Sequence, residues 1–112
     1  MPNQTASLDR VFQALADPTR RAVVERLCYG PASVSDLAQP FRMALPSFSQ
    51  HLEVLEHCGL VRSRKSGRVR TYRLAPRRLK VAEHWLETQR MHWDRRLDQL
   101  DAFLTNLKEH PR

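Results

Sequence analysis

The stretch that decides the fold is residues 33–57, which read SVSDLAQPFRMALPSFSQHLEVLEH. Ser33 followed by Asp36 has the spacing of a capping box, so a short helix is predicted to begin there and to end near Pro40. A second helix is predicted over about 45–57, because apolar residues recur at helical spacing, at Phe48, Leu52 and Leu55. The stretch therefore predicts two helices joined by a tight connection.

Two further helices are predicted upstream. Ser7 can cap the first, whose apolar residues fall at i, i+3, i+4 and i+7, namely Leu8, Val11, Phe12 and Leu15. Asp17 and Pro18 have the order of an N-cap and a first helical residue. Gly30 and Pro31 are predicted to end this second helix. Its buried stripe is predicted to be Ala22, Val23, Leu27 and Cys28.

Downstream, the period of the apolar residues changes. Residues 60–66 and 69–74 predict two strands around Ser66-Gly67, a hairpin turn signal. A helix is then predicted over about 79–107, which at 1.5 Å per residue spans roughly 43 Å. This order of elements is that of a winged helix-turn-helix. The predicted fold class is mainly α with a small β-hairpin and a long C-terminal helix.

Positive charge is concentrated in one segment. The 112 residues carry a formal net charge of +7. Nine of the 19 Lys and Arg residues lie in 62–80, which has no acidic residue, whereas the other 93 residues hold 10 basic and 12 acidic ones. Such a segment repels itself unless a polyanion neutralises it. With 41% hydrophobic and 28% charged residues, the chain has the composition of a folded domain.

The helix over 45–57 is predicted to lie in the major groove of DNA. With Phe48 at the centre of its buried face, Ser49 lies on the flank and the residues that point outward are Pro46, Ser47, Gln50 and Glu53. Glu53 would repel phosphate, so the helix is expected to leave the groove before it. The predicted base-reading residues are therefore Pro46, Ser47, Ser49 and Gln50. An ordinary solvated helix surface is the alternative.

Basic residues surround the tip of the predicted hairpin, at Arg64, Lys65, Arg68 and Arg70. In this position they could follow the DNA backbone or enter the minor groove. The alternative is a solvated charged face.

Four segments together carry a family resemblance: LADPTRR at 15–21, SQHLEVLE at 49–56, GLV at 59–61 and GRVRTY at 67–72. With them the chain resembles the ArsR/SmtB family of bacterial winged-helix repressors. The resemblance implies a homodimer that binds double-stranded DNA at an inverted-repeat operator, usually as a repressor released by a small-molecule effector. His51 matches the histidine of the family motif, and it is predicted to pack or to contact a phosphate rather than to catalyse.

The resemblance also raises the question of a metal. The best-known members bind thiophilic metals through two cysteines at the start of the third helix, where Ser33 and Ser35 stand here, and hydroxyls are poor ligands for soft ions. A second type of site uses the last helix. Its candidates here are Glu83, His84, His92, Asp94 and Asp98, of which the two histidines are two turns apart unless a dimer pairs them. We expect a member with no metal and no other cofactor.

A second copy of the chain is the predicted partner of the last helix. Its leucine and tryptophan residues recur every seven residues and continue to Leu104 and Leu107, further than one domain needs. Arg90 interrupts the pattern. The alternative is a helix that only covers its own domain. The predicted dimer interface comprises Leu8, Phe12, Trp85, Leu86, Trp93, Leu97, Leu100 and Leu104.

Other classes of protein fit less well. The sequence has no phosphate loop, nucleophile elbow or metal triad, so an enzyme is not expected. A winged-helix module for protein contacts, or one that coats nucleic acid without specificity, is the alternative function. No apolar run suggests a membrane partner, and Cys28 and Cys58, expected to be structural thiols, suit a cytoplasmic protein. The predicted divisions are a flexible N-terminus at 1–6, a DNA-binding domain at 7–78, a helix on that domain at 79–107 and a flexible tail at 108–112.

Overall fold

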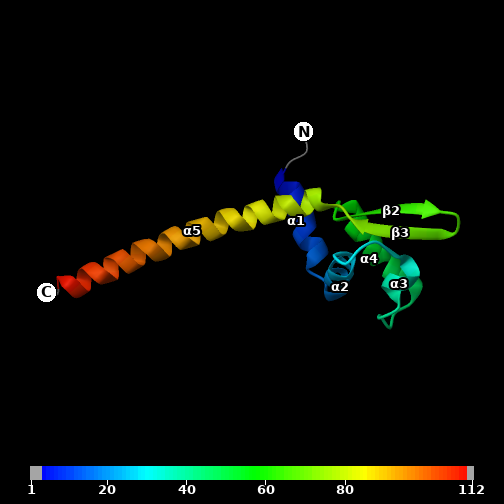
Figure 1. Ribbon diagram of the computed structural model, residues 1–112, viewed down its shortest axis with the longest axis horizontal. Helices are drawn as coiled ribbons and strands as arrows, with labels where there is room; N and C mark the ends of the chain where they lie inside the picture. Colours follow the sequence, from blue (N-terminus) through cyan, green and yellow to red (C-terminus); the bar gives the residue numbers. More distant parts are fainter. Residues whose placement is uncertain (1–3, 111–112) are drawn as a thin grey trace. The chain divides into compact units, whose positions relative to one another are not determined.

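The computed structural model describes residues 4–110, and Figure 1 shows how its elements follow one another. Helices dominate, with three short antiparallel strands, so the predicted fold class is confirmed. The elements are α1 (Gln4–Leu15), α2 (Pro18–Leu27), β1 (Ala32–Ser33), α3 (Val34–Ala38), α4 (Leu45–His57), β2 (Val61–Ser66), β3 (Val69–Leu74) and α5 (Pro76–Glu109).

Local capping signals mark where α2 and α3 begin. The side chain of Ser33 accepts a hydrogen bond from the backbone N–H of Asp36 at 3.1 Å, so the predicted cap of α3 is present. Asp17 caps α2 in the same way, through the N–H of Arg20 at 3.1 Å. Helix α4 begins and ends where the apolar spacing predicted. Local sequence signals were therefore sufficient to place the helix-turn-helix.

The structure differs from the prediction in where α1 and α5 begin and in one additional strand, β1. Helix α1 begins at Gln4, and Ser7 does not cap it but accepts a hydrogen bond from Nη1 of Arg78 at 3.0 Å. Helix α5 begins at Pro76, because proline is compatible with the first turn of a helix, and it continues to Glu109. Strand β1 was not predicted, since two residues carry no readable period. The predicted flexible ends lie partly outside the described residues, at 1–3 and 111–112.

The sheet has the order β1-β3-β2, with β3 in the centre. Ala32 of β1 pairs with Tyr72, and Ser63 of β2 pairs with the same residue from the other side. Strand β1 comes directly before α3, so this pairing ties the start of the helix-turn-helix to the hairpin. Gly67, at a φ of 61°, and Arg68 form the two-residue turn between β2 and β3.

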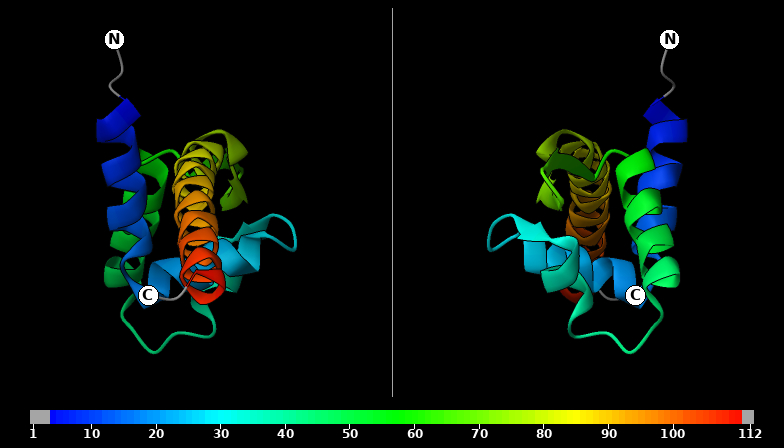
Figure 2. Two further views of the ribbon diagram at one scale, coloured as in Figure 1. Left: turned by 90° about the vertical axis from the view of Figure 1, so that its left-hand side faces the viewer. Right: turned by 90° about the vertical axis from the view of Figure 1, so that its right-hand side faces the viewer.

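One hydrophobic core lies within residues up to Ala82, and α4 supplies its largest side chains. Phe48 and Leu55 are fully buried, and Phe41 packs on Phe48 with ring centroids 5.3 Å apart. Both views of Figure 2 show α4 beside α1, which contributes Val11 to the same core. The prediction for Cys28 was wrong: it is exposed, because α2 ends at Leu27 and the stripe ends with it.

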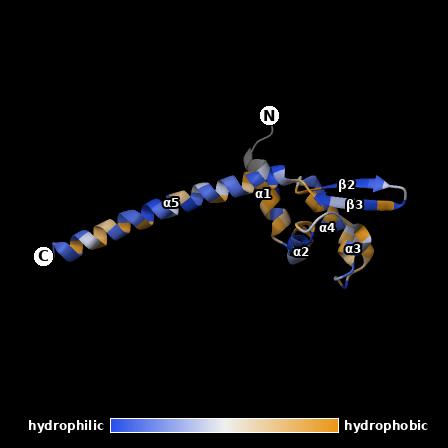
Figure 3. Ribbon diagram, viewed as in Figure 1, coloured by the Kyte–Doolittle hydropathy of each residue, from blue (hydrophilic) through white to orange (hydrophobic). Residues whose placement is uncertain are grey.

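Residues 83–109 continue α5 as a single helix with no buried side chain. Figure 3 shows apolar and polar residues alternating along it. Its large apolar side chains are exposed in the single chain, by between 43% for Trp85 and 68% for Trp93. Among the described residues, no helix is apolar over a length that would cross a bilayer.

Candidate nucleic-acid interface

The outer face of α4 carries the residues predicted to read bases. Pro46, Ser47 and Gln50 are exposed, whereas Ser49 is half-buried at the flank of the core-facing stripe. Phe48 lies between them and is fully buried, so it sets the direction in which its neighbours point. The helix therefore presents hydroxyl and amide groups that can donate hydrogen bonds to base edges or accept them.

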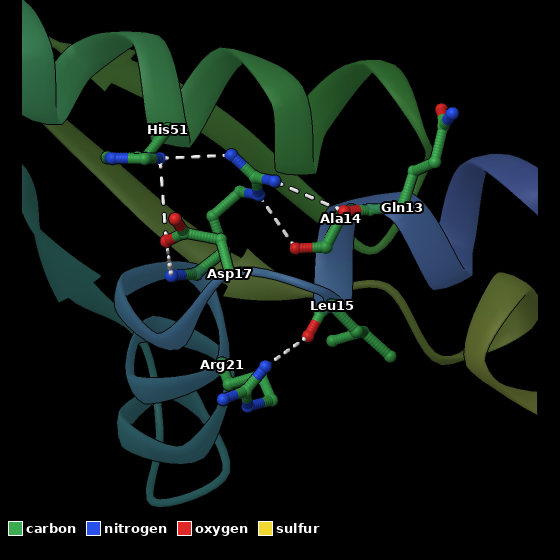
Figure 4. Close-up of polar contacts among 7 residues, drawn as sticks. Gln13, Ala14, Leu15, Asp17, Arg21 and His51 are labelled. Atoms are coloured by element: carbon green, nitrogen blue, oxygen red, sulfur yellow. Dashed lines mark hydrogen bonds and ion pairs between the residues drawn. The ribbon is translucent and has the colours of Figure 1, made fainter.

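The corner between α1 and α2 contacts α4 through Arg20. Figure 4 labels three residues to which Arg20 bonds, His51, Ala14 and Gln13. Nη1 of Arg20 lies 3.1 Å from Nδ1 of His51, while its Nε donates to the carbonyl oxygen of Ala14 at 2.7 Å and its Nη2 to that of Gln13 at 3.1 Å. These carbonyls belong to the last turn of α1, where backbone acceptors lack partners within the helix. Arg20 therefore joins α1, α2 and α4.

Asp17 belongs to the same group of side chains, with Oδ2 at 3.8 Å from Nδ1 of His51. Desolvation would raise the pKa of Asp17, but the hydrogen bonds from the backbone of Arg20 and Thr19 and the charge of Arg20 bring this pKa below its ordinary value. The corner between α1 and α2 thus holds a carboxylate that favours its charged form beside α4.

The wing, residues 61–74, contacts the C-terminal end of α4. Ser63 of β2 donates a hydrogen bond to Oε2 of Glu56 at 2.7 Å, and Nη1 of Arg70 donates to Oγ of Ser63 at 2.8 Å. Tyr72 lies opposite Ser63, and burial together with the charge of Glu56 raises the pKa of its hydroxyl. A chain of polar contacts therefore runs from α4 to Arg70, a predicted DNA-backbone residue.

Basic side chains occupy both faces of the wing. Lys65 lies directly opposite Arg70, and Arg62 lies directly opposite Arg73, and all four are exposed. Like charges in directly opposed positions destabilise a sheet. Arg62 and Arg73 were not among the predicted contact residues, although they belong to the same basic run, 62–80. The predicted residues Arg64 and Arg68 are exposed as well.

Within a single chain, no three His, Cys, Asp or Glu residues come together in the part that the structure describes. Ser33, at one position of the family's cysteine pair, uses its hydroxyl to cap α3. Cys58 is buried, its thiol contacts the carbonyl oxygen of Leu55 at 3.2 Å, and burial raises its pKa. A thiol with a raised pKa is a poor nucleophile and a poor metal ligand at neutral pH.

A helix-turn-helix followed by a basic hairpin is the winged helix-turn-helix fold, which is typical of DNA-binding regulators. Residues 15–64 match the family model of a helix-turn-helix domain. The crystal structure of an ArsR family transcriptional regulator superposes with a TM-score of 0.78 and 50% identity, covering 84% of this chain and 97% of that one. The chain belongs to the ArsR/SmtB family of winged helix-turn-helix transcriptional regulators, as its sequence motifs indicated.

Other relatives agree with this membership. Over 70 residues the chain is 51% identical to the transcriptional regulator Rv2034 of Mycobacterium tuberculosis, an alignment that spans 62% of this chain and 65% of that protein. It is 30% identical to the transcriptional repressor SdpR of Bacillus subtilis, over 70% of this chain and 88% of SdpR. The homodimeric winged helix-turn-helix DNA-binding domain of Mb0332 from Mycobacterium bovis, solved by NMR, superposes with a TM-score of 0.61 and 28% identity, covering 88% of this chain and 93% of that domain.

Proposed function

We propose that the protein is a homodimeric transcriptional repressor, which binds an inverted-repeat DNA operator with α4 in the major groove and the wing on the adjacent backbone or minor groove. One observation carries the proposal: the exposed polar face of α4 and the basic wing belong to one connected unit, through Glu56, Ser63 and Arg70. Base-reading groups and phosphate-binding groups are thereby held at a fixed separation, as recognition of a defined DNA site requires.

The division of labour follows from the chemistry of the two parts. The arginine and lysine residues of the wing bind DNA phosphates whatever the base sequence. They account for the part of the affinity that decreases as the salt concentration rises. Ser47 and Gln50 are uncharged, so their contribution depends on which base edges they meet. Glu53 is exposed one turn further along α4, where its carboxylate would repel phosphates and limit how deeply the helix enters the groove.

Dimerisation rests on the apolar stripe of α5. Leu86, Trp93, Leu100 and Leu107 recur every seven residues, and Leu97 and Leu104 complete a spacing of four and three between 93 and 107. This is the pattern of a helix that packs against another helix. The solved homodimer of Mb0332 supports the same assembly for this chain. The proposed assembly is therefore a homodimer with two wings, which we place in the cytoplasm. Any small-molecule effector would act on that dimer.

Selection from a pool of random DNA duplexes tests the proposal. The purified protein should enrich a two-fold symmetric sequence, and in gel shifts it should prefer that duplex over a scrambled one by about 10³ or more at physiological salt. Equal retention of both duplexes would instead favour a module that coats nucleic acid without specificity. For repression, a promoter that contains the enriched sequence should be less active when the protein is expressed.

A further inference from the structure

Two of the four segments that carry the family resemblance meet each other in space. Arg20 lies in the first, residues 15–21, and His51 lies in the second, residues 49–56, and their side chains are 3.1 Å apart. His51 was predicted as a packing or phosphate-contacting residue. In Figure 4 dashed lines join Nδ1 of its ring to side chains at the corner between α1 and α2, and this contact suggests a different role.

The chemistry of the contact defines the state of the imidazole. A guanidinium group only donates hydrogen bonds, so Nδ1 of His51 must be the acceptor and the ring proton must lie on Nε2. Oδ2 of Asp17, at 3.8 Å from the same Nδ1, is beyond hydrogen-bond distance. His51 is therefore bonded through Arg20 to the end of α1.

Orientation of α4 is sensitive to this contact. His51 follows Gln50 directly and lies one turn after Ser47, so a bond at His51 restrains rotation about the helix axis. Side chains reach roughly 5 to 6 Å from that axis, and a rotation of about 10° would move their ends by about 1 Å. Hydrogen bonds to base edges occupy a narrower range of distances than that.

The restraint acts at two points along α4. Arg20 bonds to His51, and Ser63 of the wing bonds to Glu56, five residues further along. Five residues span about 7.5 Å of helix. Two bonds at that separation, one from α2 and one from the wing, restrain both the rotation and the tilt of α4 relative to these two elements.

We propose that His51 is a positioning residue for DNA reading: by accepting the hydrogen bond of Arg20 at Nδ1, it orients α4 so that Ser47 and Gln50 face the bases. The proposal rests on the proposed function. Loss of the contact lowers discrimination between DNA sequences, whereas binding to DNA of arbitrary sequence, which depends on the wing, is retained.

Three variants separate positioning through Nδ1 from a DNA contact through Nε2. His51→Asn keeps an acceptor close to the place of Nδ1, His51→Gln puts its amide near the place of Nε2, and His51→Leu has neither. The probes are the duplex enriched from the random pool and its scrambled counterpart. Thermal unfolding of each variant shows that it is folded at the assay temperature.

The expected result is that His51→Asn keeps the ratio of the two affinities within about threefold of wild type, while His51→Gln and His51→Leu lower it by about tenfold or more, the loss expected for one misaligned base contact. The affinity for scrambled DNA stays the same in all three. Retention of the ratio by His51→Gln and its loss in His51→Asn would overturn the proposal in favour of a direct DNA contact. An unchanged ratio in His51→Leu would also overturn it.

A second measurement needs no DNA, so it separates failure of this inference from failure of the proposed function. Nitrogen-15 NMR of the free protein should show Nδ1 of His51 unprotonated at neutral pH, with a resonance that changes in Arg20→Met but not in Arg21→Met. Arg21 is a matched control because its guanidinium bonds to the carbonyl oxygen of Leu15, at 2.8 Å, and not to His51. A protonated Nδ1, or a resonance indifferent to Arg20→Met, would refute the contact even if an operator is found.

Discussion

At the scale of single residues, the interface separates specificity from affinity. Gln50→Ala removes an exposed amide from the outer face of α4 and should change which bases are preferred. Repeating the selection from the random pool with this variant measures the effect. If the variant enriched the same sequence as the wild type, Gln50 would not read bases.

Arg68→Ala should have the opposite signature. Arg68 lies in the turn of the wing, so its loss should weaken binding to enriched and scrambled duplexes alike and reduce the slope of log affinity against log salt by about 1. Gel shifts over a series of salt concentrations measure this slope. Arg95→Ala, which removes an exposed arginine of α5 instead, is the control and should leave it unchanged.

Asp17 links the stability of the corner to pH. Because the pKa of Asp17 is lowered in the folded protein, its carboxylate stabilises the fold above the unfolded pKa, and this contribution is lost as the pH falls below about 4. Asparagine is an equally good N-cap without a charge, so Asp17→Asn isolates this effect. The wild type should unfold at a higher temperature than Asp17→Asn at pH 7, with a gap that narrows towards pH 3. A gap that does not change with pH would contradict the prediction.

At the scale of elements, what could be predicted from the sequence depended on how local its signals are. The period of Phe48, Leu52 and Leu55 was sufficient to place α4, and Ser66-Gly67 was sufficient to place the hairpin. Strand β1 could not be predicted, because its two residues are a strand only by virtue of pairing with β3, which lies about forty residues later in the chain.

The candidate site shows the same limit. The outward residues of α4 could be read from a helical wheel, because a wheel needs only the order of residues. The role of Arg20 could not, although its motif was recognised, since the contact with His51 joins residues 31 positions apart. Sequence spacing gives the faces of elements, whereas bonds between elements depend on how those elements pack.

The connection from α4 into β2 depends on Gly59, which leads to a prediction at this scale. Its φ is 84°, and an added Cβ would lie 2.6 Å from Cγ of Arg78. Gly59→Ala should therefore destabilise the protein by more than the roughly 1–2 kcal/mol of the left-handed backbone alone. Gly67→Ala is the matched control, because its φ is also positive but the space around it is open. Urea unfolding compares the two, and an equal loss would refute the clash with Arg78.

At the scale of the whole molecule, the net charge of +7 describes two different parts. The segment 62–80 holds nine basic residues and no acidic ones, and the remainder of the chain is slightly acidic. A homodimer therefore presents two cationic wings on an otherwise balanced surface. The two-fold axis of such a dimer would place its two α4 helices about one turn of DNA apart, roughly 34 Å.

The assembly itself is tested by a charge placed in the apolar stripe of α5. Leu100 is 51% exposed in the single chain, and Leu100→Glu would bury a carboxylate in the proposed interface. Sedimentation should give about twice the 13.1 kDa of one chain for the wild type and 13.1 kDa for this variant. Asn106→Glu, on the polar side of the same helix, is the control and should remain a dimer.

Leu100→Glu should also lose affinity for the two-fold symmetric duplex. It should bind a single half-site as the wild type does, because the substitution removes only the linkage between the two DNA-binding domains. A variant that stays dimeric would place the interface elsewhere on the chain.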